Sequence, residues 1–149
     1  MDANARADKI ARFMLAAEGT GPAWGVALEE AREGYARVRM RLTPQMLNGH
    51  GTAHGGMLFA LADSAFAYAC NSRNLRTVAA QASIVFLEPA REGEMLIAEA
   101  RERALVARSG VYDVSVRTAD GRAIAEFTGF SRSVGGEVVP HSPSPEGRG

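Results

Sequence analysis

One stretch of this sequence, from Gly55 to Asn71, constrains the fold more than any other. It reads GGMLFALADSAFAYACN, a helical pattern of small and apolar residues, and residues 55–72 contain no Lys, Arg or Glu. A helix that is apolar on nearly all sides has to be buried. The extended stretches around it are the segments that can cover it, so we expect a sheet packed over this helix.

The other elements predict an α+β fold in which one long helix is inserted among antiparallel strands. An amphipathic helix is expected over residues 3–18, where apolar side chains recur at helical spacing. The strand over residues 35–42 alternates apolar side chains with arginines, so one face is expected to be buried and the other solvated. The remaining predicted strands cover residues 24–32, 77–87, 94–103, 109–118 and 123–132.

A single domain followed by a tail accounts for the whole length. The chain has 149 residues, which suits one compact domain with a core of its own. We therefore predict one domain over residues 1–134. The last segment, residues 135–149, is rich in Gly, Pro and Ser and is predicted to be disordered.

Composition and charge exclude several classes of partner. The chain has 17 Lys and Arg against 17 Asp and Glu, and this balance argues against nucleic-acid binding, which needs a basic face. The longest apolar runs fall far short of the roughly 20 residues that span a bilayer. The N-terminus lacks the basic-then-apolar pattern of a signal peptide. We expect a cytoplasmic protein with no nucleic-acid or membrane partner.

Asp63 is the anomaly of the central helix. Aspartate is unfavourable in a helix interior, and the other residues on its stripe, Gly56, Ala60, Ala67 and Asn71, are small or uncharged. An ionised carboxylate in a semi-apolar cleft is costly unless it has a partner or a task. Asp63 is therefore either a solvated side chain on an exposed helix face or a functional group.

The approach to the central helix is rich in glycine. Asn48-Gly49-His50-Gly51 is followed by His54-Gly55-Gly56. The first turn of a helix has free backbone N–H groups at the positive end of the helix dipole, and glycine lets a ligand oxygen come close to them. Such groups could stabilise the oxyanion that forms during acyl transfer. An ordinary glycine-rich turn is the alternative.

Metal and cysteine chemistry are both disfavoured. His50 and His54 are four residues apart, but the glycines around them oppose the helix that a metal-binding pair at this spacing would need. The third histidine, His141, lies in the tail. Cys70 is expected to pack as a small apolar side chain. We expect no metal and no redox cofactor.

The stretch from Leu47 to Ser72 closely resembles the PaaI-type (phenylacetate-pathway) branch of the hotdog-fold acyl-CoA thioesterases. The resemblance lies in His54-Gly55-Gly56 followed by an acid eight residues after the first glycine. It continues through Phe86-Leu87-Glu88-Pro89 and Gly110-Val111-Tyr112-Asp113 and covers roughly residues 10–135. It implies a hotdog fold, an antiparallel sheet wrapped around one long central helix.

The resemblance also implies roles for individual residues. Asp63 matches the family's catalytic carboxylate, which acts as a base or as a nucleophile. Gly55 matches the residue whose backbone N–H polarises the thioester carbonyl, with Gly56 next to it in the same turn. Asn48 matches an upstream amide that helps to hold the carbonyl or the water, and His54 matches a histidine with a more structural role.

Contacts to the rest of the substrate are less well matched. Some relatives place a hydroxyl on the strand after the helix to position water, and residues 78–81 contain none. Ala79 and Gln81 are the candidate contacts there. The phosphates of CoA would need arginines at the mouth of the cleft, and each candidate also suits a solvated surface. The candidates are Arg73, Arg76, Arg91 and Arg108.

Helix geometry predicts that the site is shared between two chains. Gly55 and Asp63 are eight residues apart, which places them about 12 Å apart along the helix axis. A base has to come within about 3 Å of the water that it activates. Two helices running antiparallel about a two-fold axis would bring Gly55 of one protomer to Asp63 of the other. We expect a homodimer, and the resemblance implies that two dimers form a homotetramer.

The leading hypothesis is hydrolysis of acyl-CoA thioesters to a free acid and CoA. The resemblance implies phenylacetyl-CoA or a ring-hydroxylated or related aryl-CoA as substrate. A hotdog dehydratase or hydratase is an alternative, although those relatives pair a histidine with a carboxylate in a pattern that this chain lacks. A non-catalytic acyl-CoA-binding module is another, but it would leave the lone carboxylate of the central helix without a task.

Overall fold

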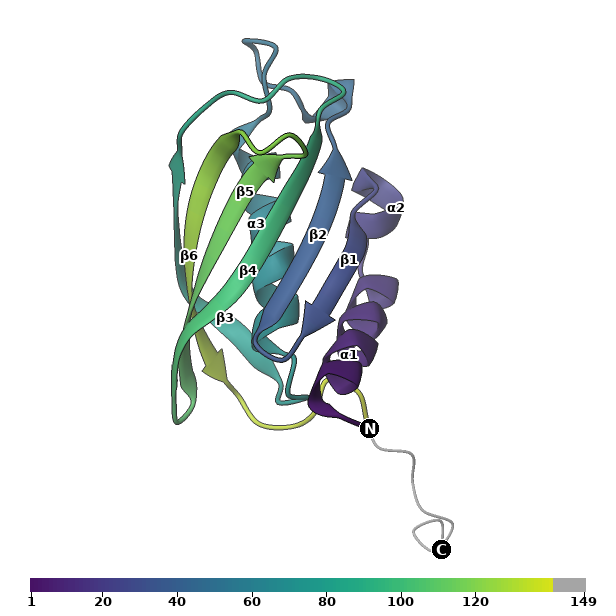
Figure 1. The fold of residues 1–149 in the computed structure, drawn as a ribbon, viewed down its shortest axis with the longest axis vertical. Coiled ribbons are helices and arrows are strands. Elements are labelled where there is room, and N and C mark those ends of the chain that lie inside the picture. Colours follow the sequence, from purple (N-terminus) through teal and green to yellow (C-terminus); the bar gives the residue numbers. More distant parts are fainter. Residues whose placement is uncertain (141–149) are drawn as a thin grey trace, which may run out of the picture.

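Six antiparallel strands curve around one central helix, α3 (Gly55–Cys70), in the computed structural model, which describes residues 1–140 (Figure 1). The strand order across the sheet is β1-β2-β4-β5-β6-β3. The strands are β1 (Ala27–Arg32), β2 (Tyr35–Arg41), β3 (Thr77–Phe86), β4 (Met95–Val106), β5 (Ser109–Thr118) and β6 (Ala123–Ser133). Two further helices, α1 (Ala3–Ala17) and α2 (Thr20–Trp24), precede the sheet.

The ends of α3 lie within one residue of those predicted. His54 caps the start of the helix, because its Nδ1 accepts a hydrogen bond of 2.9 Å from the Gly56 N–H. Asn71 caps the end, where its amide donates to the carbonyl oxygens of Ala67 and Thr77. These caps satisfy backbone groups that every helix end leaves free.

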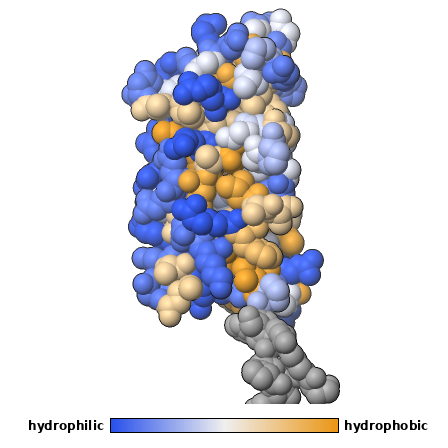
Figure 2. Space-filling view, turned by 90° about the vertical axis from the view of Figure 1, so that its right-hand side faces the viewer, coloured by the Kyte–Doolittle hydropathy of each residue, from blue (hydrophilic) through white to orange (hydrophobic). Residues whose placement is uncertain are grey.

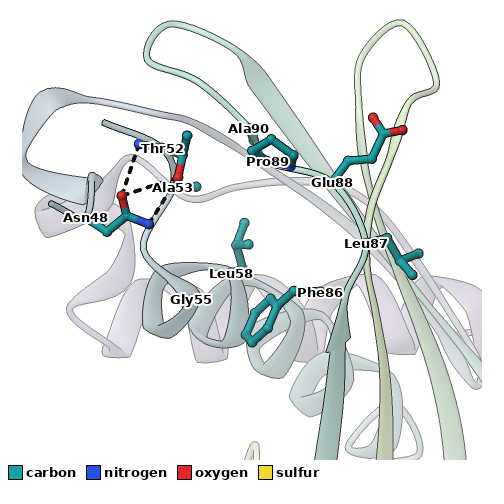
Figure 3. A pocket seen from close by; sticks show the side chains of 10 residues that line it. All are labelled: Asn48, Thr52, Ala53, Gly55, Leu58, Phe86, Leu87, Glu88, Pro89 and Ala90. Carbon is teal, nitrogen blue, oxygen red and sulfur yellow. Dashed lines mark hydrogen bonds between the residues drawn. The ribbon is translucent and has the colours of Figure 1, made fainter. Parts of the chain in front are cut away.

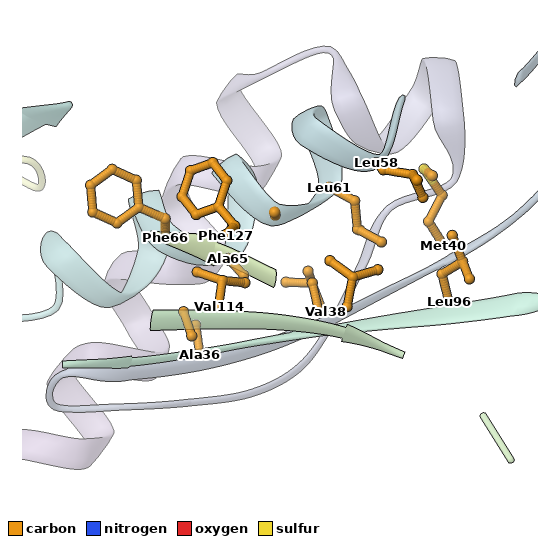
Figure 4. Close-up of a cluster of buried hydrophobic side chains, with 14 of the residues drawn as sticks. Ala36, Val38, Met40, Leu58, Leu61, Ala65, Phe66, Leu96, Val114 and Phe127 are labelled. Carbon is orange, nitrogen blue, oxygen red and sulfur yellow. The ribbon is translucent and has the colours of Figure 1, made fainter. Parts of the chain in front are cut away.

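The face of α3 toward the sheet carries its larger apolar side chains. Leu61 is fully buried and Phe66 is 1% exposed. Figure 4 shows these side chains meeting the inner face of the sheet; the sheet residues labelled there are Ala36, Val38, Met40, Leu96, Val114 and Phe127. The alternation predicted for β2 is thus confirmed, with its apolar face in the core.

Helical spacing in the sequence also predicts that four residues of α3, Phe59, Ala62, Phe66 and Ala69, face the sheet, and one of them needs a correction. Ala62, Phe66 and Ala69 are buried as expected, but Phe59 is 36% exposed. Its ring packs edge-on against Phe127 at a centroid distance of 5.2 Å, so Phe59 lies at the border of the core. On the stripe that contains Asp63, the middle residues Ala60, Asp63 and Ala67 are half buried, whereas Gly56 is exposed and Asn71 is buried.

The two sides of the molecule differ in polarity. On the outer face of the sheet, Arg37 pairs with Glu29 at 2.7 Å and with Glu30 at 3.2 Å. Figure 2 looks onto the side where α1 and α2 lie, and there hydrophilic residues gather on one half and apolar residues on the other. The sheet therefore has a solvated outer face, and the apolar surface lies toward the helices.

Residues 20–26 differ from the strand expected to begin at residue 24. Residues 20–24 form the short helix α2, and β1 begins only at Ala27. Pro22 is tolerated because it lies in the first turn, where its missing N–H is not needed. Gly25, with a φ of 68°, ends the helix in the left-handed conformation.

The turn between β4 and β5 is also shorter than expected. β4 continues to Val106, past a bulge between Glu102 and Ala104. The tight turn then passes through Ala107, which has a φ of 53°. The bulge lets the strand keep pairing with β5 over residues that the sequence assigned to a connection.

Residues 135–140, which follow the predicted domain boundary at residue 134, contact the rest of the fold. Asn74 accepts a hydrogen bond of 2.8 Å from the Val139 N–H and donates one of 3.1 Å to the Val139 carbonyl. Arg76 N–H donates to the Gly136 carbonyl at 3.0 Å. These bonds hold residues 135–140 against the segment before β3. Residues 141–149 of the predicted tail lie outside the described residues.

None of the helices within residues 1–140 combines the length and the apolar character that a membrane span requires.

Replacing Gly129 with Ala is expected to destabilise the fold. A Cβ at Gly129 would lie 2.7 Å from Cζ of the buried Phe66 ring. Overpacking of this kind costs about 1–3 kcal/mol of unfolding free energy, which urea denaturation would measure. Gly19→Ala is the matched control, because nothing lies within 4 Å of its Cβ position. A Gly129→Ala protein as stable as the control would contradict this packing.

Candidate active site

A cavity of about 370 Å³ opens at the N-terminal end of α3 (Figure 3). Three segments enclose it: the loop before α3, the first turns of α3, and the end of β3 with the residues that follow. The lining residues are Asn48, Thr52, Ala53, Gly55, Leu58, Phe86, Leu87, Glu88, Pro89 and Ala90. The structure therefore brings the predicted site residues Asn48 and Gly55 to one cavity.

Gly55 offers a free backbone donor to this cavity. The N–H groups of Met57 and Leu58 bond to the His54 carbonyl, and the Gly56 N–H bonds to the His54 side chain. The Gly55 N–H has no acceptor within residues 1–140. It lies at the positive end of the α3 dipole, where a developing negative charge is stabilised.

Asn48 shapes the loop that leads to Gly55. Its Oδ1 accepts hydrogen bonds from the N–H groups of His50, at 2.9 Å, and Thr52, at 3.2 Å. Its Nδ2 donates to Thr52 Oγ1 at 3.1 Å (Figure 3). The amide nitrogen carries a second hydrogen, for which residues 1–140 supply no acceptor. Asn48 thus stabilises the loop and has one amide N–H left that can donate to a bound molecule.

Phe86 lines the cavity, although the sequence pattern does not predict it as a site residue. Its ring lies against the start of α3, since a Cβ added at Gly55 would be only 2.9 Å from Phe86 Cζ (Figure 3). The side chain is nevertheless 54% exposed. A side chain at the first residue of α3 would have to displace this ring, which favours glycine there. No sequence signal links two residues so far apart in the chain.

Asp63 does not line this cavity. It lies two turns further along α3, in the half-buried middle of its stripe. Burial raises the pKa of its carboxyl group, and no cation in residues 1–140 forms an ion pair with it. A single chain therefore keeps the free N–H and the carboxylate apart, as the helix geometry predicts.

The predicted contacts to the rest of the substrate lie in three places. Ala79 and Gln81 are exposed on β3. Arg91 lies beside the cavity wall, where its backbone pairs with that of Thr52. Arg108 lies in the turn between β4 and β5, away from the cavity. Of these, the structure brings only Arg91 close to the lining residues.

Arg73 and Arg76 have different surroundings. Arg73 forms ion pairs with Glu33 at 2.8 Å and with Glu102 at 2.7 Å. These two carboxylates hold its pKa above the usual range. Arg76 is exposed. The side chain of Arg73 is thus held by two ion pairs, whereas that of Arg76 is exposed to solvent.

Within residues 1–140 no group of three or more His, Cys, Asp and Glu side chains could hold a metal ion. His54 is used as a helix cap and His50 is exposed. His141 lies outside the described residues.

β3 forms an uncharged edge of the sheet. It pairs only with β6, so its other side is unpaired within residues 1–140. Residues 77–87 contain no charged side chain, and the exposed side chains there include Val85, at 60%, and Leu87, at 51%. Soluble proteins usually protect such edges with charges or prolines. An exposed apolar edge of this kind is typical of an interaction surface.

Comparison with known proteins identifies the family. The family model described as the thioesterase superfamily matches residues 50–125. The chain belongs to the thioesterase superfamily. One member, the acyl-coenzyme A thioesterase PaaI of Escherichia coli (strain K12), is 42% identical over 129 residues, which cover 87% of this chain and 92% of that protein. A putative esterase of Archaeoglobus fulgidus is 38% identical over 113 residues, which cover 76% of this chain and 73% of that protein.

Solved structures of thioesterases share the fold. The structure of the E. coli PaaI protein from the phenylacetic acid degradation operon superposes with a TM-score of 0.89 at 40% identity, covering 91% of this chain and 99% of that one. A hypothetical thioesterase from Streptococcus pneumoniae, solved with coenzyme A, superposes with a TM-score of 0.72 at 27% identity. The match covers 75% of this chain and 90% of that one. The predicted hotdog fold is confirmed.

Replacing Asp63 with Asn is expected to stabilise the fold at neutral pH. Burial raises the pKa of Asp63 above its ordinary value of 3.8, so the folded state disfavours the ionised form. Stability is therefore lost as the pH rises from that value through the raised pKa. Asn carries no such penalty.

Urea unfolding at pH 7 and near pH 4 would measure this difference. The free energy of unfolding of Asp63→Asn should be larger than that of wild type at pH 7, and this difference should become smaller at the lower pH. Asp8→Asn is the control, because Asp8 is exposed and paired with Arg12 at 2.9 Å. A destabilised Asp63→Asn protein at pH 7 would contradict the burial argument.

Proposed function

We propose that this member of the thioesterase superfamily hydrolyses acyl-CoA thioesters to a carboxylic acid and CoA. The observation that carries the proposal is the free N–H of Gly55, at the positive end of α3 and on the wall of a cavity. The 42% identity to an acyl-coenzyme A thioesterase supports it. So does the S. pneumoniae thioesterase of the same fold that was solved with coenzyme A.

In the proposed reaction the thioester carbonyl oxygen accepts a hydrogen bond from the Gly55 N–H. As the carbonyl carbon is attacked, negative charge develops on this oxygen. A preorganised backbone donor stabilises such an oxyanion by about 3 kcal/mol, and the helix dipole adds to this. The remaining donor of Asn48, which lines the same cavity, is placed to help hold the carbonyl or the water.

Asp63 is the proposed catalytic carboxylate. It acts either as a general base that takes a proton from water or as a nucleophile that forms an anhydride with the acyl group. Burial raises its pKa, which makes the carboxylate a stronger base than an exposed one. In both routes the C–S bond breaks and the CoA sulfur receives a proton.

A homodimer completes the proposed site. Two chains that pair through the uncharged edge of β3 would extend the sheet across the dimer. Their α3 helices would then run antiparallel, with the free N–H of Gly55 in one protomer facing Asp63 in the other. The small residues beside Asp63 permit this close approach. We propose that such dimers assemble further into a homotetramer.

The proposed acyl group is arylacetyl or aryl, with phenylacetyl-CoA and ring-hydroxylated or related aryl-CoA esters as candidate substrates. The similarity to PaaI of the phenylacetic acid degradation operon supports this choice. The exposed ring of Phe86 beside Gly55 offers an aromatic contact to such a group.

Thiol release from phenylacetyl-CoA tests the proposal. Asp63→Asn removes the base and is expected to lower turnover by roughly 10²–10⁴, while binding of the CoA ester, measured by calorimetry, persists. Asp8→Asn, which changes an exposed carboxylate of α1, should retain wild-type turnover. An Asp63→Asn protein within tenfold of wild type would contradict the assigned role. Binding without thiol release by wild type would favour a non-catalytic module.

A further inference from the structure

Thr52 lines the cavity beside Asn48 and has no assigned role in the site described so far. Its backbone is held on two sides. On one side the Asn48 N–H donates to the Thr52 carbonyl at 2.8 Å. On the other side Thr52 forms a bridge with Arg91, and the N–H of the next residue, Ala53, donates to the Ala90 carbonyl at 2.8 Å. The Thr52 side chain therefore starts from a fixed place between the loop before α3 and the segment after β3.

The Thr52 hydroxyl contacts both ends of the Asn48 amide (Figure 3). Thr52 Oγ1 accepts a hydrogen bond of 3.1 Å from Asn48 Nδ2, and it lies 3.3 Å from Asn48 Oδ1, to which it can donate. A hydroxyl that donates to Oδ1 turns its lone pairs toward Nδ2. Threonine is β-branched, so its χ1 angle has few accessible values. The hydroxyl is thus a fixed acceptor for the nitrogen end of the amide.

Two backbone bonds determine which end of the Asn48 amide is the oxygen. Oδ1 accepts from the N–H groups of His50, at 2.9 Å, and Thr52, at 3.2 Å. A nitrogen in that place would face two donors, which excludes the flipped amide. These two bonds hold only the oxygen end. The bond from Nδ2 to Thr52 Oγ1 adds a third point, which fixes the amide plane and with it the direction of the second hydrogen on Nδ2.

We propose that Thr52 is a positioning residue of the thioesterase site, which aims the remaining N–H of Asn48 at the thioester carbonyl oxygen. This inference rests on the proposed function and adds a residue to it. A donor that is already aimed stabilises the developing negative charge without reorganising during the reaction. Without the Thr52 hydroxyl, the amide keeps its bonds through Oδ1 but is free to tilt. The loss falls on the transition state more than on binding, because the charge on the oxygen is larger there.

Thiol release from phenylacetyl-CoA by Thr52→Val tests this role. Valine keeps the β-branched shape and the backbone N–H but lacks the hydroxyl. The kcat should fall about three- to tenfold, as expected for the loss of one hydrogen bond, whereas KM should stay within about twofold of wild type. Thr52→Ser keeps the hydroxyl and should restore kcat.

Thr43→Val is the matched control, because the Thr43 side chain makes no capping hydrogen bond and lies outside the cavity. It should match wild type. A Thr52→Val protein with wild-type kcat, or a Thr52→Ser protein as slow as Thr52→Val, would overturn the inference. Either result in an active wild-type enzyme would leave the thioesterase proposal intact.

A double-mutant cycle separates action through Asn48 from a purely structural role. An Asn48→Ala protein has no amide to position, so adding Thr52→Val should lower its kcat no further. The same fold loss from Thr52→Val in the wild-type and Asn48→Ala backgrounds would overturn the inference. Thr52 would then act on stability or on the substrate by another route.

Nuclear Overhauser contacts in wild-type protein labelled with ¹³C and ¹⁵N give a test that needs neither turnover nor a folded variant. The side-chain NH₂ of Asn48 should contact the side chain of Thr52. An NH₂ group that contacts the His50 backbone N–H instead would belong to a flipped amide and would overturn the inference. The expected contacts in a protein that releases no thiol would reject the thioesterase proposal, and the role of Thr52 with it, while the amide geometry stands.

Discussion

Burial of α3 is the constraint on which the rest of the structure depends. The helix carries one charged residue in its whole length, so it is stable only where other parts of the protein exclude water from most of its surface. The sheet covers the side that carries Leu61 and Phe66. The middle of the stripe that contains Asp63 is left half buried, and the edge of β3 is left unpaired within residues 1–140.

The same helix supplies both groups of the proposed reaction but cannot bring them together. Its first residue offers a free N–H to a cavity, and its only carboxylate lies about 12 Å further along the axis. A helix is too rigid to close that distance. In the proposed homodimer a second copy in antiparallel orientation would do so, and it would also cover the exposed stripe and the edge of β3. Formation of the proposed dimer would therefore bury the remaining surface of α3 and complete the site at the same time.

Much of this arrangement could be predicted from the sequence, because periodicity and glycine spacing are local signals. The ends of α3 and the buried face of β2 are of this kind, whereas the meeting of Asn48 with Gly55 was expected from the family resemblance. What could not be predicted depends on contacts between distant segments. Phe86 covers Gly55, and Glu18 bonds to Tyr68 across 50 residues of sequence. Periodicity shows that a face is apolar but not which segment covers it.

Activity restored by mixing two inactive variants tests the shared site most directly. Gly55→Pro removes the N–H and suits the first position of a helix after His54, whose ψ of 134° is extended. The added ring has to displace the Phe86 ring, which is 54% exposed and free to move aside. Equal amounts of Gly55→Pro and Asp63→Asn, unfolded and refolded together, should form mixed dimers with one intact site. The mixture should recover about a quarter of wild-type activity. A mixture no more active than the mean of its two components would contradict a site built from two chains.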